Sequence, residues 1–306
     1  MLKGRKGVGL MVLILVIFMV SPVSGSLIEN LEKKQFERLT LGNTLYVGGS
    51  GPGNYSKIQD AIDNATDGDT IYVFNGTYKE RLWLKKSLHL IGEDKETTIV
   101  DGCATGHVMM LTAGQVYISN FTIQNSSEKH AGIFVKAWSD ANKIINNIIR
   151  ANHYGIYLHQ HSIHFSFPNN VSETGCLGST ENEIIENIIL VNHYGIYLEA
   201  SSDNFIIRNT FVNNKLGIGL YEKYLGLYQI RVNSNNNIIK ENKFINNTRN
   251  AYDRCNNQWI FNYWDDWIGL RWKFLRLLPY RIPGTLVRNF DWRPAQEPYD
   301  IPRVAI

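Results

Sequence analysis

The chain has 306 residues, of which 44% are hydrophobic and 19% are charged, and its formal net charge is +3. A chain of this length can bury a large core, and its hydrophobic share excludes an intrinsically disordered protein. The positive charge is thinly spread and no long basic run occurs, so we expect no nucleic-acid partner.

The first 25 residues have the layout of a secretory signal. The basic stretch LKGRKG precedes the apolar run GLMVLILVIFMV, and small residues follow in SPVSGS. This order is typical of export signals, and we expect cleavage after Gly25. The alternative is an uncleaved anchor, although the apolar run is shorter than the ~20 residues that a spanning helix usually needs. We therefore expect a secreted or extracytoplasmic protein that meets a membrane only through an uncleaved N-terminal segment, with a linker over 26–44.

Export bears on two further residue types. Three cysteines, Cys103, Cys176 and Cys255, allow one disulfide whose partners the sequence does not choose, and the lack of a C-x-x-C pair argues against a cysteine-built zinc site. Seven N-x-S/T sequons either carry glycans, where the host has the machinery, or reflect the abundance of asparagine. They lie at Asn54, Asn64, Asn75, Asn120, Asn125, Asn170 and Asn246.

A short amphipathic helix is predicted near the start of the mature chain. In SKIQDAIDNA, residues 56–65, the apolar residues Ile58, Ala61, Ile62 and Ala65 recur at helical spacing. Such a helix can cover the open end of the repeated strands that follow, where uncovered edges would invite aggregation.

The middle of the chain repeats itself. The heptapeptide NHYGIYL occurs at 152–158 and again, unchanged, at 192–198. Longer copies align on it, and the shortest interval between them is 22 residues, the others being that unit plus inserts. The copies start at Asn142, Asn182, Asn204 and, more loosely, Asn237, with a degenerate copy around 115–139. A period near 22 residues predicts a repeat architecture.

The content of each copy predicts which repeat architecture it is. Each copy holds strands of three to five residues, such as EIIEN, IILVN and GIYLE, which are punctuated by Asn or Gly and show no helical period. One coil cannot bury its apolar side alone, so coils stack at the ~4.8 Å strand spacing around a continuous core. The asparagine that recurs at the start of each copy can bond its neighbours along the stack. We therefore expect an all-β, single-stranded, right-handed parallel β-helix over 45–262.

Three stretches resemble known families. GDTIYVFNGTYKERLWLKKSLHLIGEDKETTIVDG, at 68–102, resembles the opening coils of pectin-lyase-like β-helices. The repeats, of the form NNIIxxNxxxxNxxGIYL, resemble the periplasmic copper-binding NosD-like proteins and the carbohydrate-binding and sugar-hydrolysis (CASH) repeat group. NYWDDW, at 262–267, resembles the aromatic and acidic tail that closes many such helices. The resemblance covers about 45–270 and implies the fold; because this fold hosts lyases, hydrolases, epimerases and inert stalks, it implies no single activity.

The C-terminal segment 263–306 is expected to cap the last coil. Tryptophans crowd this end of the chain around the stretch IGLRWKFLRLLPYRIPG. The cap is expected to run as a helix and then a loop. The alternative is a basic amphipathic segment that touches a membrane or a partner.

Alternation along GIYL predicts an outward face shared by the coils. If Ile156 and Leu158 point into the stack, then His153, Gly155, Tyr157 and His159 point outward together. A glycine row would form a shallow floor, and the rings beside it would offer flat apolar faces to a polysaccharide. The alternative is an aromatic ladder that only stabilises the stack. The predicted ligand-binding residues are His130, Phe134, His153, Tyr157, His193, Tyr197, Lys215 and Tyr221.

The same face suggests acid–base chemistry. His159 and Glu199, one coil apart, form a candidate catalytic pair within reach of one ligand. The stretch YGIYLHQHS faintly resembles the YG-x-D-x-H-D-x-S stretch of alginate C5-epimerases; His159 matches its histidine, but Tyr157 and Gln160 stand where two aspartates are expected, which argues against that activity. The sequence also lacks the clustered carboxylates of calcium-dependent lyases. Whether the protein is an enzyme stays open; an active form would be a polysaccharide lyase, hydrolase or epimerase.

A metal site is the remaining candidate. His159, His161 and His164 follow the spacing H-x-H-x-x-H, and imidazole suits copper and zinc, although a polar loop with scattered histidines is the alternative. The NosD-like resemblance implies copper, and we expect no organic cofactor. The favoured function is that of an exported β-helix that binds, or also processes, polysaccharide. The alternatives are a non-catalytic structural surface protein and an accessory protein in copper-site maturation, and the oligomeric state stays open.

Overall fold

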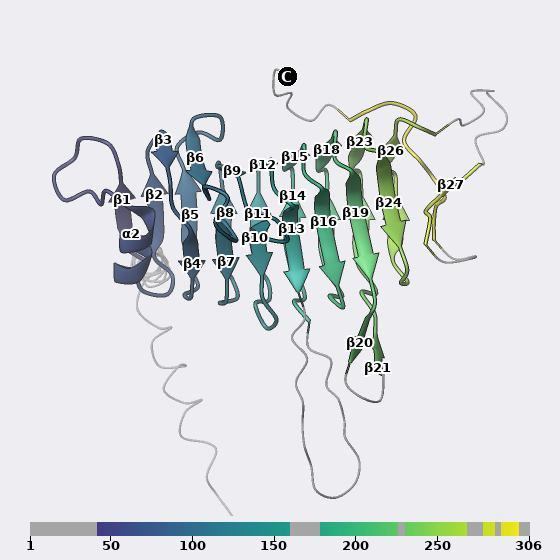
Figure 1. Ribbon diagram of the computed structural model, residues 1–306, viewed down its shortest axis with the longest axis horizontal. Helices are drawn as coiled ribbons and strands as arrows, with labels where there is room; N and C mark the ends of the chain where they lie inside the picture. Colours follow the sequence, from purple (N-terminus) through teal and green to yellow (C-terminus); the bar gives the residue numbers. More distant parts are fainter. Residues whose placement is uncertain (1–41, 160–177, 226–229, 268–277, 285–288, 300–306) are drawn as a thin grey trace, which may run out of the picture. The chain divides into compact units, whose positions relative to one another are not determined.

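The computed structural model describes residues 42–159, 178–225, 230–267, 278–284 and 289–299. Of these residues, all except Gly42 lie in the compact unit Asn43–Ile306. Its strands form three long sheets and one short hairpin. Figure 1 shows successive coils standing side by side in chain order. Among these residues we find no helix with the length and apolar character needed to cross a membrane. His161 and His164, predicted to bind metal, lie outside the described residues.

Each coil contributes one strand to each of the sheets that we call A, B and C. Sheet A contains, in spatial order, β1 (Thr44–Val47), β2 (Thr70–Val73), β5 (His89–Gly92), β8 (Tyr117–Ser119), β11 (Lys143–Ile145), β14 (Glu183–Ile185), β17 (Phe205–Ile207), β22 (Ile238–Lys240), β25 (Gln258–Ile260), β28 (Phe290–Asp291) and β27 (Tyr280–Arg281). Sheet B contains β3 (Gly76–Tyr78), β6 (Thr98–Asp101), β9 (Thr122–Gln124), β12 (Ile148–Arg150), β15 (Ile188–Leu190), β18 (Thr210–Val212), β23 (Lys243–Ile245) and β26 (Tyr263–Trp264).

Sheet C carries the repeated heptapeptide. Its strands are β4 (Leu82–Leu84), β7 (Met109–Leu111), β10 (Ala131–Val135), β13 (Tyr154–His159), β16 (Tyr194–Glu199), β19 (Leu216–Tyr221) and β24 (Arg249–Asp253). β13 and β16 pair in parallel with Ile156 opposite Ile196, so the two copies of the heptapeptide lie one above the other. An antiparallel hairpin of β20 (Lys223–Leu225) and β21 (Ile230–Val232) follows β19. The chain is a right-handed parallel β-helix, which confirms the prediction from the repeats.

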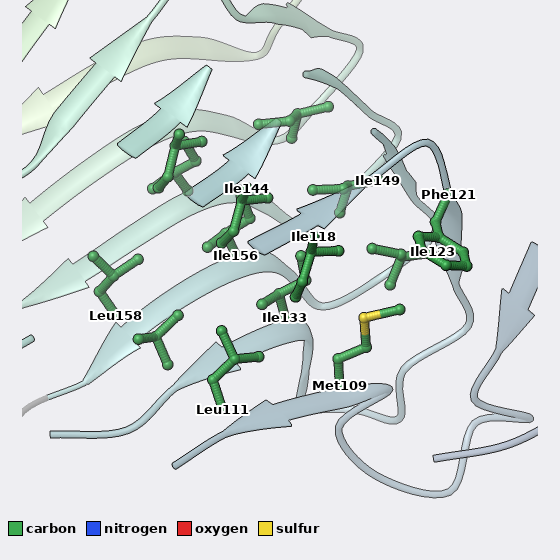
Figure 2. Packing of buried hydrophobic residues seen from close by; sticks show 14 of the residues in the cluster. Met109, Leu111, Ile118, Phe121, Ile123, Ile133, Ile144, Ile149, Ile156 and Leu158 are labelled. Atoms are coloured by element: carbon green, nitrogen blue, oxygen red, sulfur yellow. The ribbon is translucent and has the colours of Figure 1, made fainter. Parts of the chain in front are cut away.

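The core consists of columns of like side chains, one per coil. In sheet A, Ile118, Ile144, Ile184, Ile206 and Ile239 are fully buried at equivalent positions. Figure 2 shows Ile144, Ile156, Ile133 and their neighbours filling the space between the sheets. Because each apolar side chain packs on its copy in the next coil, the columns account for the repetition of the sequence.

Buried asparagines mark the three corners of each coil. At each step the side-chain Oδ1 of one asparagine accepts a hydrogen bond from the backbone N–H of the asparagine one coil earlier. At all steps except that from Asn152 to Asn192 it also accepts from the Nδ2 of that asparagine, as Asn182 does for Asn142 at 3.1 and 2.8 Å. The ladder predicted from the start of each copy is confirmed. It runs through Asn142, Asn182, Asn204, Asn237 and Asn257. Two further ladders pass through Asn147, Asn187, Asn209, Asn242 and Asn262, and through Asn152, Asn192, Asn214 and Asn247.

Both ends of the stack have specific terminations. The helix α2 (Ile58–Asn64) buries Ile58 and Ile62 against the core, as predicted for 56–65. At the other end, a ladder amide meets a carboxylate: Asn262 Nδ2 donates to Asp291 Oδ2 at 3.1 Å, and Asn257 Nδ2 donates to Asp253 Oδ1 at 3.0 Å. The described part of the C-terminal segment adds β27 and β28 to sheet A. The predicted helix of this segment falls on IGLRWKFLRL, residues 268–277, which lie outside the described residues.

Candidate functional site

The outer face of sheet C presents a row of aromatic side chains. Alternation in β13 buries Ile156 and Leu158 completely and leaves Tyr157 and His159 on the outer face, half-buried. Each strand of sheet C from β4 to β24 has one residue at the position equivalent to Tyr157. These residues are, in spatial order, Trp83, Met110, Phe134, Tyr157, Tyr197, Gly219 and Tyr252. Five of these seven positions are aromatic, so stacking the coils places rings above one another.

The rings from β10 to β24 are in continuous contact. Ring centroids are 5.3 Å apart for Phe134 and Tyr157, 5.0 Å for Tyr157 and Tyr197, and 4.8 Å for Tyr197 and Tyr221. Tyr221 belongs to the neighbouring column, but its ring covers Gly219, where an added Cβ would lie 2.6 Å from the Tyr221 ring. Tyr221 then contacts Tyr252 at 5.3 Å. We call Trp83, Phe134, Tyr157, Tyr197, Tyr221 and Tyr252 the aromatic track.

The predicted floor of outward glycines is wrong. A Cβ added at Gly155 would lie 2.5 Å from the carbonyl oxygen of Gly195 and near Ile189 of the core, and one at Gly195 would meet Phe211 of the core. The glycines therefore face inward, where the next coil leaves no room for a side chain. The assumed alternation fails because it does not continue through the corner between His153 and Gly155, and Tyr154 and Tyr194 occupy the outer face instead, with their rings stacked 5.1 Å apart.

Imidazoles border the aromatic track. His153 and His193 stack with centroids 4.7 Å apart and an interplanar angle of 12°. His107 stacks on Phe134 at 4.3 Å and meets His130 edge-on at 4.6 Å. Of the three histidines predicted to bind ligand, His153 and His193 are thus in direct contact with each other, while His130 contacts the ring of His107.

Burial and nearby positive charges lower the pKa of His107, His153 and His193, which favours their neutral form near pH 7. Burial lowers the pKa of His107 to about 4, and the nearby charges of His130 and Arg81 act in the same direction. Burial, followed by repulsion from His193, also lowers the pKa of His153. The pKa of His193 is lowered by burial and by Lys215. Neutral imidazole is both a hydrogen-bonding partner and a metal ligand.

A compact polar cluster closes one side of the aromatic track. The Tyr157 hydroxyl donates to Glu199 Oε2 at 2.9 Å, and His159 Nδ1 lies 3.0 Å from the same oxygen. Lys223 Nζ, at the base of the hairpin, donates to it at 3.0 Å. Burial by itself would raise the pKa of Glu199, but the hydrogen bonds from His159, Lys223 and Tyr157 outweigh it and lower that pKa to about 2. The structure thus brings together the candidate catalytic pair, with Glu199 held as an anion.

The described residues do not form a complete metal cage. No group of three or more His, Cys, Asp and Glu side chains within the described ranges converges on one point. His159 faces Glu199 through Nδ1, and the pairs His153–His193 and His107–His130 supply two imidazoles each. His107 Nδ1 already accepts the backbone N–H of Ala131 at 2.9 Å. A copper ion would therefore find paired imidazoles here, fewer ligands than a closed site needs.

The cysteines do not complete such a site. Cys103 is exposed and Cys255 is buried, and both are free thiols, while Cys176 lies outside the described residues. Burial raises the pKa of Cys255 to about 12, so its thiol stays protonated and is a poor metal ligand.

Several residues of the face escaped prediction. Tyr154 and Tyr194 belong to the repeated heptapeptide, so the sequence shows that they lie at equivalent positions. The assumed alternation nevertheless predicted that their side chains point into the core. His107 comes from outside the aligned copies, and Lys223 stands near the end of the copy that starts at Asn204, outside the repeated heptapeptide. Their proximity to Phe134 and Glu199 follows from the pairing of the coils.

The comparisons with known proteins agree with this architecture. Residues 62–267, more than half of the chain, match the model of the family described as "Periplasmic copper-binding protein (NosD)". No curated protein matches this sequence. The periplasmic family confirms the extracytoplasmic location expected from the N-terminal sequence.

Solved structures of similar fold include pectin-active enzymes. Pectin methylesterase from carrot shares 12% identity at a TM-score of 0.43 over 67% of this chain, and the match spans 64% of the carrot enzyme, less than two thirds of its length. Pectin methylesterase PemA from Erwinia chrysanthemi shares 10% identity at a TM-score of 0.39, covering 83% of this chain and 93% of that one. Pectate lyase Pel9A shares 12% identity at a TM-score of 0.40, covering 73% and 70%.

At such identities, and with TM-scores below 0.5, these structures say nothing about what this chain binds. The match to the family model over residues 62–267 is the finding that identifies the chain, and it agrees with the β-helix and with the repeats that build it. The chain belongs to the NosD family of periplasmic copper-binding proteins.

Proposed function

We propose that this extracytoplasmic β-helix binds polysaccharide along the aromatic track. The observation that carries the proposal is the unbroken contact of rings from Phe134 to Tyr252 across the coils of sheet C. Aromatic side chains combine a flat apolar face with a polar edge, which suits sugar rings. Seven strands at the ~4.8 Å strand spacing give a track of roughly 29 Å, long enough for several sugar units.

Two features favour ligand binding over stacking alone. The Trp83 side chain at one end of the aromatic track is 44% exposed, although indole usually gains from burial. Beside the track, imidazole and hydroxyl groups supply hydrogen-bond donors and acceptors for a ligand. Rings that only stabilised the stack would not need such groups beside them. Stacking still contributes to stability, since a cross-strand pair is worth ~0.2–1 kcal/mol.

The test is a glycan array probed with the purified protein, followed by affinity measurement on the glycans that bind. The double variant Tyr157→Ala with Tyr197→Ala is expected to abolish binding. Tyr117→Ala, which removes a half-buried ring from the outer face of sheet A, is the matched control and should bind normally. Silence across acidic and neutral glycans would instead support a non-catalytic structural role.

A catalytic role for His159 and Glu199 is part of the same proposal. Glu199, with a pKa of about 2, stays ionised, so it orients His159 and does not itself donate a proton. Both polar contacts of His159 in the described part of the chain use Nδ1, which leaves Nε2 to accept or donate a proton during catalysis. If His159→Ala and Glu199→Gln leave the turnover of a bound glycan unchanged, the role is excluded.

Copper handling is the second candidate function. It is favoured by the family description and by the stacked imidazoles of His153 and His193, because copper binds the unprotonated nitrogen of a neutral imidazole. In this role the ion is cargo for an accessory protein. Metal content after copper loading and dialysis tests it: the double variant His153→Ala with His193→Ala should lose copper, and so should a triple variant of His159, His161 and His164 if the predicted loop site contributes. Equal copper content in all variants excludes these residues.

A further inference from the structure

Exposed cations border the aromatic track. Each of them lies within one residue of the end of a strand of sheet C. They are Arg81, Lys85, Lys136, Lys215, Arg249 and Arg254. They come from four of the seven strands, β4, β10, β19 and β24, so positive charge is present at both ends of the track and between them.

Cations also sit against the rings at both ends of the aromatic track. Lys85 Nζ lies 3.7 Å from the centroid of Trp83. At the opposite end, the guanidinium carbons of Arg249 and Arg254 lie 5.5 and 5.9 Å from the centroid of Tyr252. These contacts hold charged groups beside the surface on which a sugar would stack.

The carboxylates near this face are largely neutralised by partners. Glu199 is bonded by His159 and Lys223, and Glu222 by Arg254 and Arg231 at 3.4 and 3.6 Å. Glu199 and Glu222 therefore repel a negatively charged ligand less than two unpaired carboxylates would. Glu128 is a carboxylate that stays exposed, close enough to raise the pKa of His153.

Sheet A provides the comparison. On its outer face Lys143 pairs with Glu183 at 3.2 Å, and Lys240 pairs with Glu241 at 3.1 Å. Lysines there have acidic partners, whereas Lys136 and Lys85 face the aromatic track. The cationic border thus belongs to the side of the helix that carries the rings.

We propose that the ligand of the aromatic track is an acidic polysaccharide whose sugar units carry carboxylates, that is, a uronate polymer. The proposal rests on the proposed function and specifies its substrate class. Rings contact the sugar faces while lysine and arginine make charge-assisted hydrogen bonds to the carboxylates. Because successive coils repeat at ~4.8 Å, a polymer with one charge per unit can meet cations at several coils.

The test compares one polymer in two charge states by calorimetry on the full chain. The probes are an oligogalacturonate long enough to span the track and the same oligomer with its carboxylates methyl-esterified. We expect the acid form to bind at least tenfold more tightly. Its affinity should fall steeply as salt rises from about 0.01 to 1 M, across which the Debye length shrinks from about 30 to about 3 Å.

Charge-removing variants complete the test. Lys136→Gln and Arg249→Gln should each weaken binding of the acid form about twofold to fivefold, the range expected for one exposed ion pair, and leave the esterified form unaffected. Lys143→Gln on sheet A is the matched control and should change neither.

The outcomes are distinguishable. Equal affinity for both forms, with loss in the Tyr157→Ala, Tyr197→Ala variant, overturns the acidic specificity but keeps glycan binding. Failure of every glycan to bind overturns both proposals. Binding of single-stranded DNA as tightly as of the acid form would mean that charge alone is recognised, and would overturn the assignment to a uronate polymer.

Discussion

Replacing Asn187 by alanine removes one rung from the middle of an asparagine ladder. Its Nδ2 donates to the carbonyl oxygens of Ile144 and Ile185 at 2.7 and 3.1 Å and to Asn209 Oδ1 at 3.0 Å. Its Oδ1 accepts from the backbone N–H and the Nδ2 of Asn147 at 2.9 and 3.1 Å. The side chain is fully buried, so water cannot replace these bonds.

The magnitude follows from these bonds. A net hydrogen bond is worth ~1 kcal/mol, and a buried group left without a partner costs ~1–3 kcal/mol. Five bonds and at least one orphaned N–H therefore predict a loss of about 3–5 kcal/mol in the free energy of unfolding, well above the ~1 kcal/mol of an average substitution.

Urea unfolding followed by tryptophan fluorescence measures this loss. The matched control is Asn256→Ala, which changes an exposed asparagine of a late coil and should stay within ~0.5 kcal/mol of the parent. If Asn187→Ala costs no more than Asn256→Ala, the ladders do not stabilise the fold as argued.

Three further predictions concern backbone strain, pH and packing. Val191 has a φ of 55°, which is unfavourable for a β-branched residue, and Asn213 occupies the equivalent corner of the next coil with a φ of 53°. Val191→Asn should therefore raise the free energy of unfolding by about 1 kcal/mol, and Asn213→Val should lower it. Urea titration of both variants measures these changes. The pKa of Glu199 falls from 4.5 to about 2 on folding, so the stability lost in Glu199→Gln should be about 3 kcal/mol above pH 4.5 and should shrink as the pH falls towards 2. A difference in unfolding free energy that does not change with pH would contradict the hydrogen-bonded cluster around Glu199. Gly195→Ala places a Cβ against a carbonyl oxygen of the next coil, so its melting temperature should fall, and an unchanged melting temperature would show that the corner can relax.

Repetition explains how far sequence reasoning reached. The spacing of the heptapeptides predicts that Tyr157 lies over Tyr197 and Asn182 over Asn204, because stacked coils bring equivalent positions together. The capping helix at Ile58–Asn64 follows from its apolar spacing.

Corners and contacts outside the repeats explain what sequence reasoning missed. Alternation predicts side-chain direction only within a strand, and the corner before Gly155 breaks it, which is why Tyr154 was assigned to the wrong side. The second and third asparagine ladders were visible in every copy, but no rule of spacing distinguishes a buried corner asparagine from an exposed one such as Asn213. Lys223 reaches Glu199 from the first residue of the hairpin strand β20, a contact that depends on how the coils pair.

The measurement that tests the central claim most directly is the affinity of the purified protein for oligogalacturonate, compared with that of the variant carrying Tyr157→Ala and Tyr197→Ala. We predict saturable binding by the parent and its loss in the variant, with Tyr117→Ala unchanged. Equal binding by all three proteins would contradict the account, because the rings would then have no part in recognition.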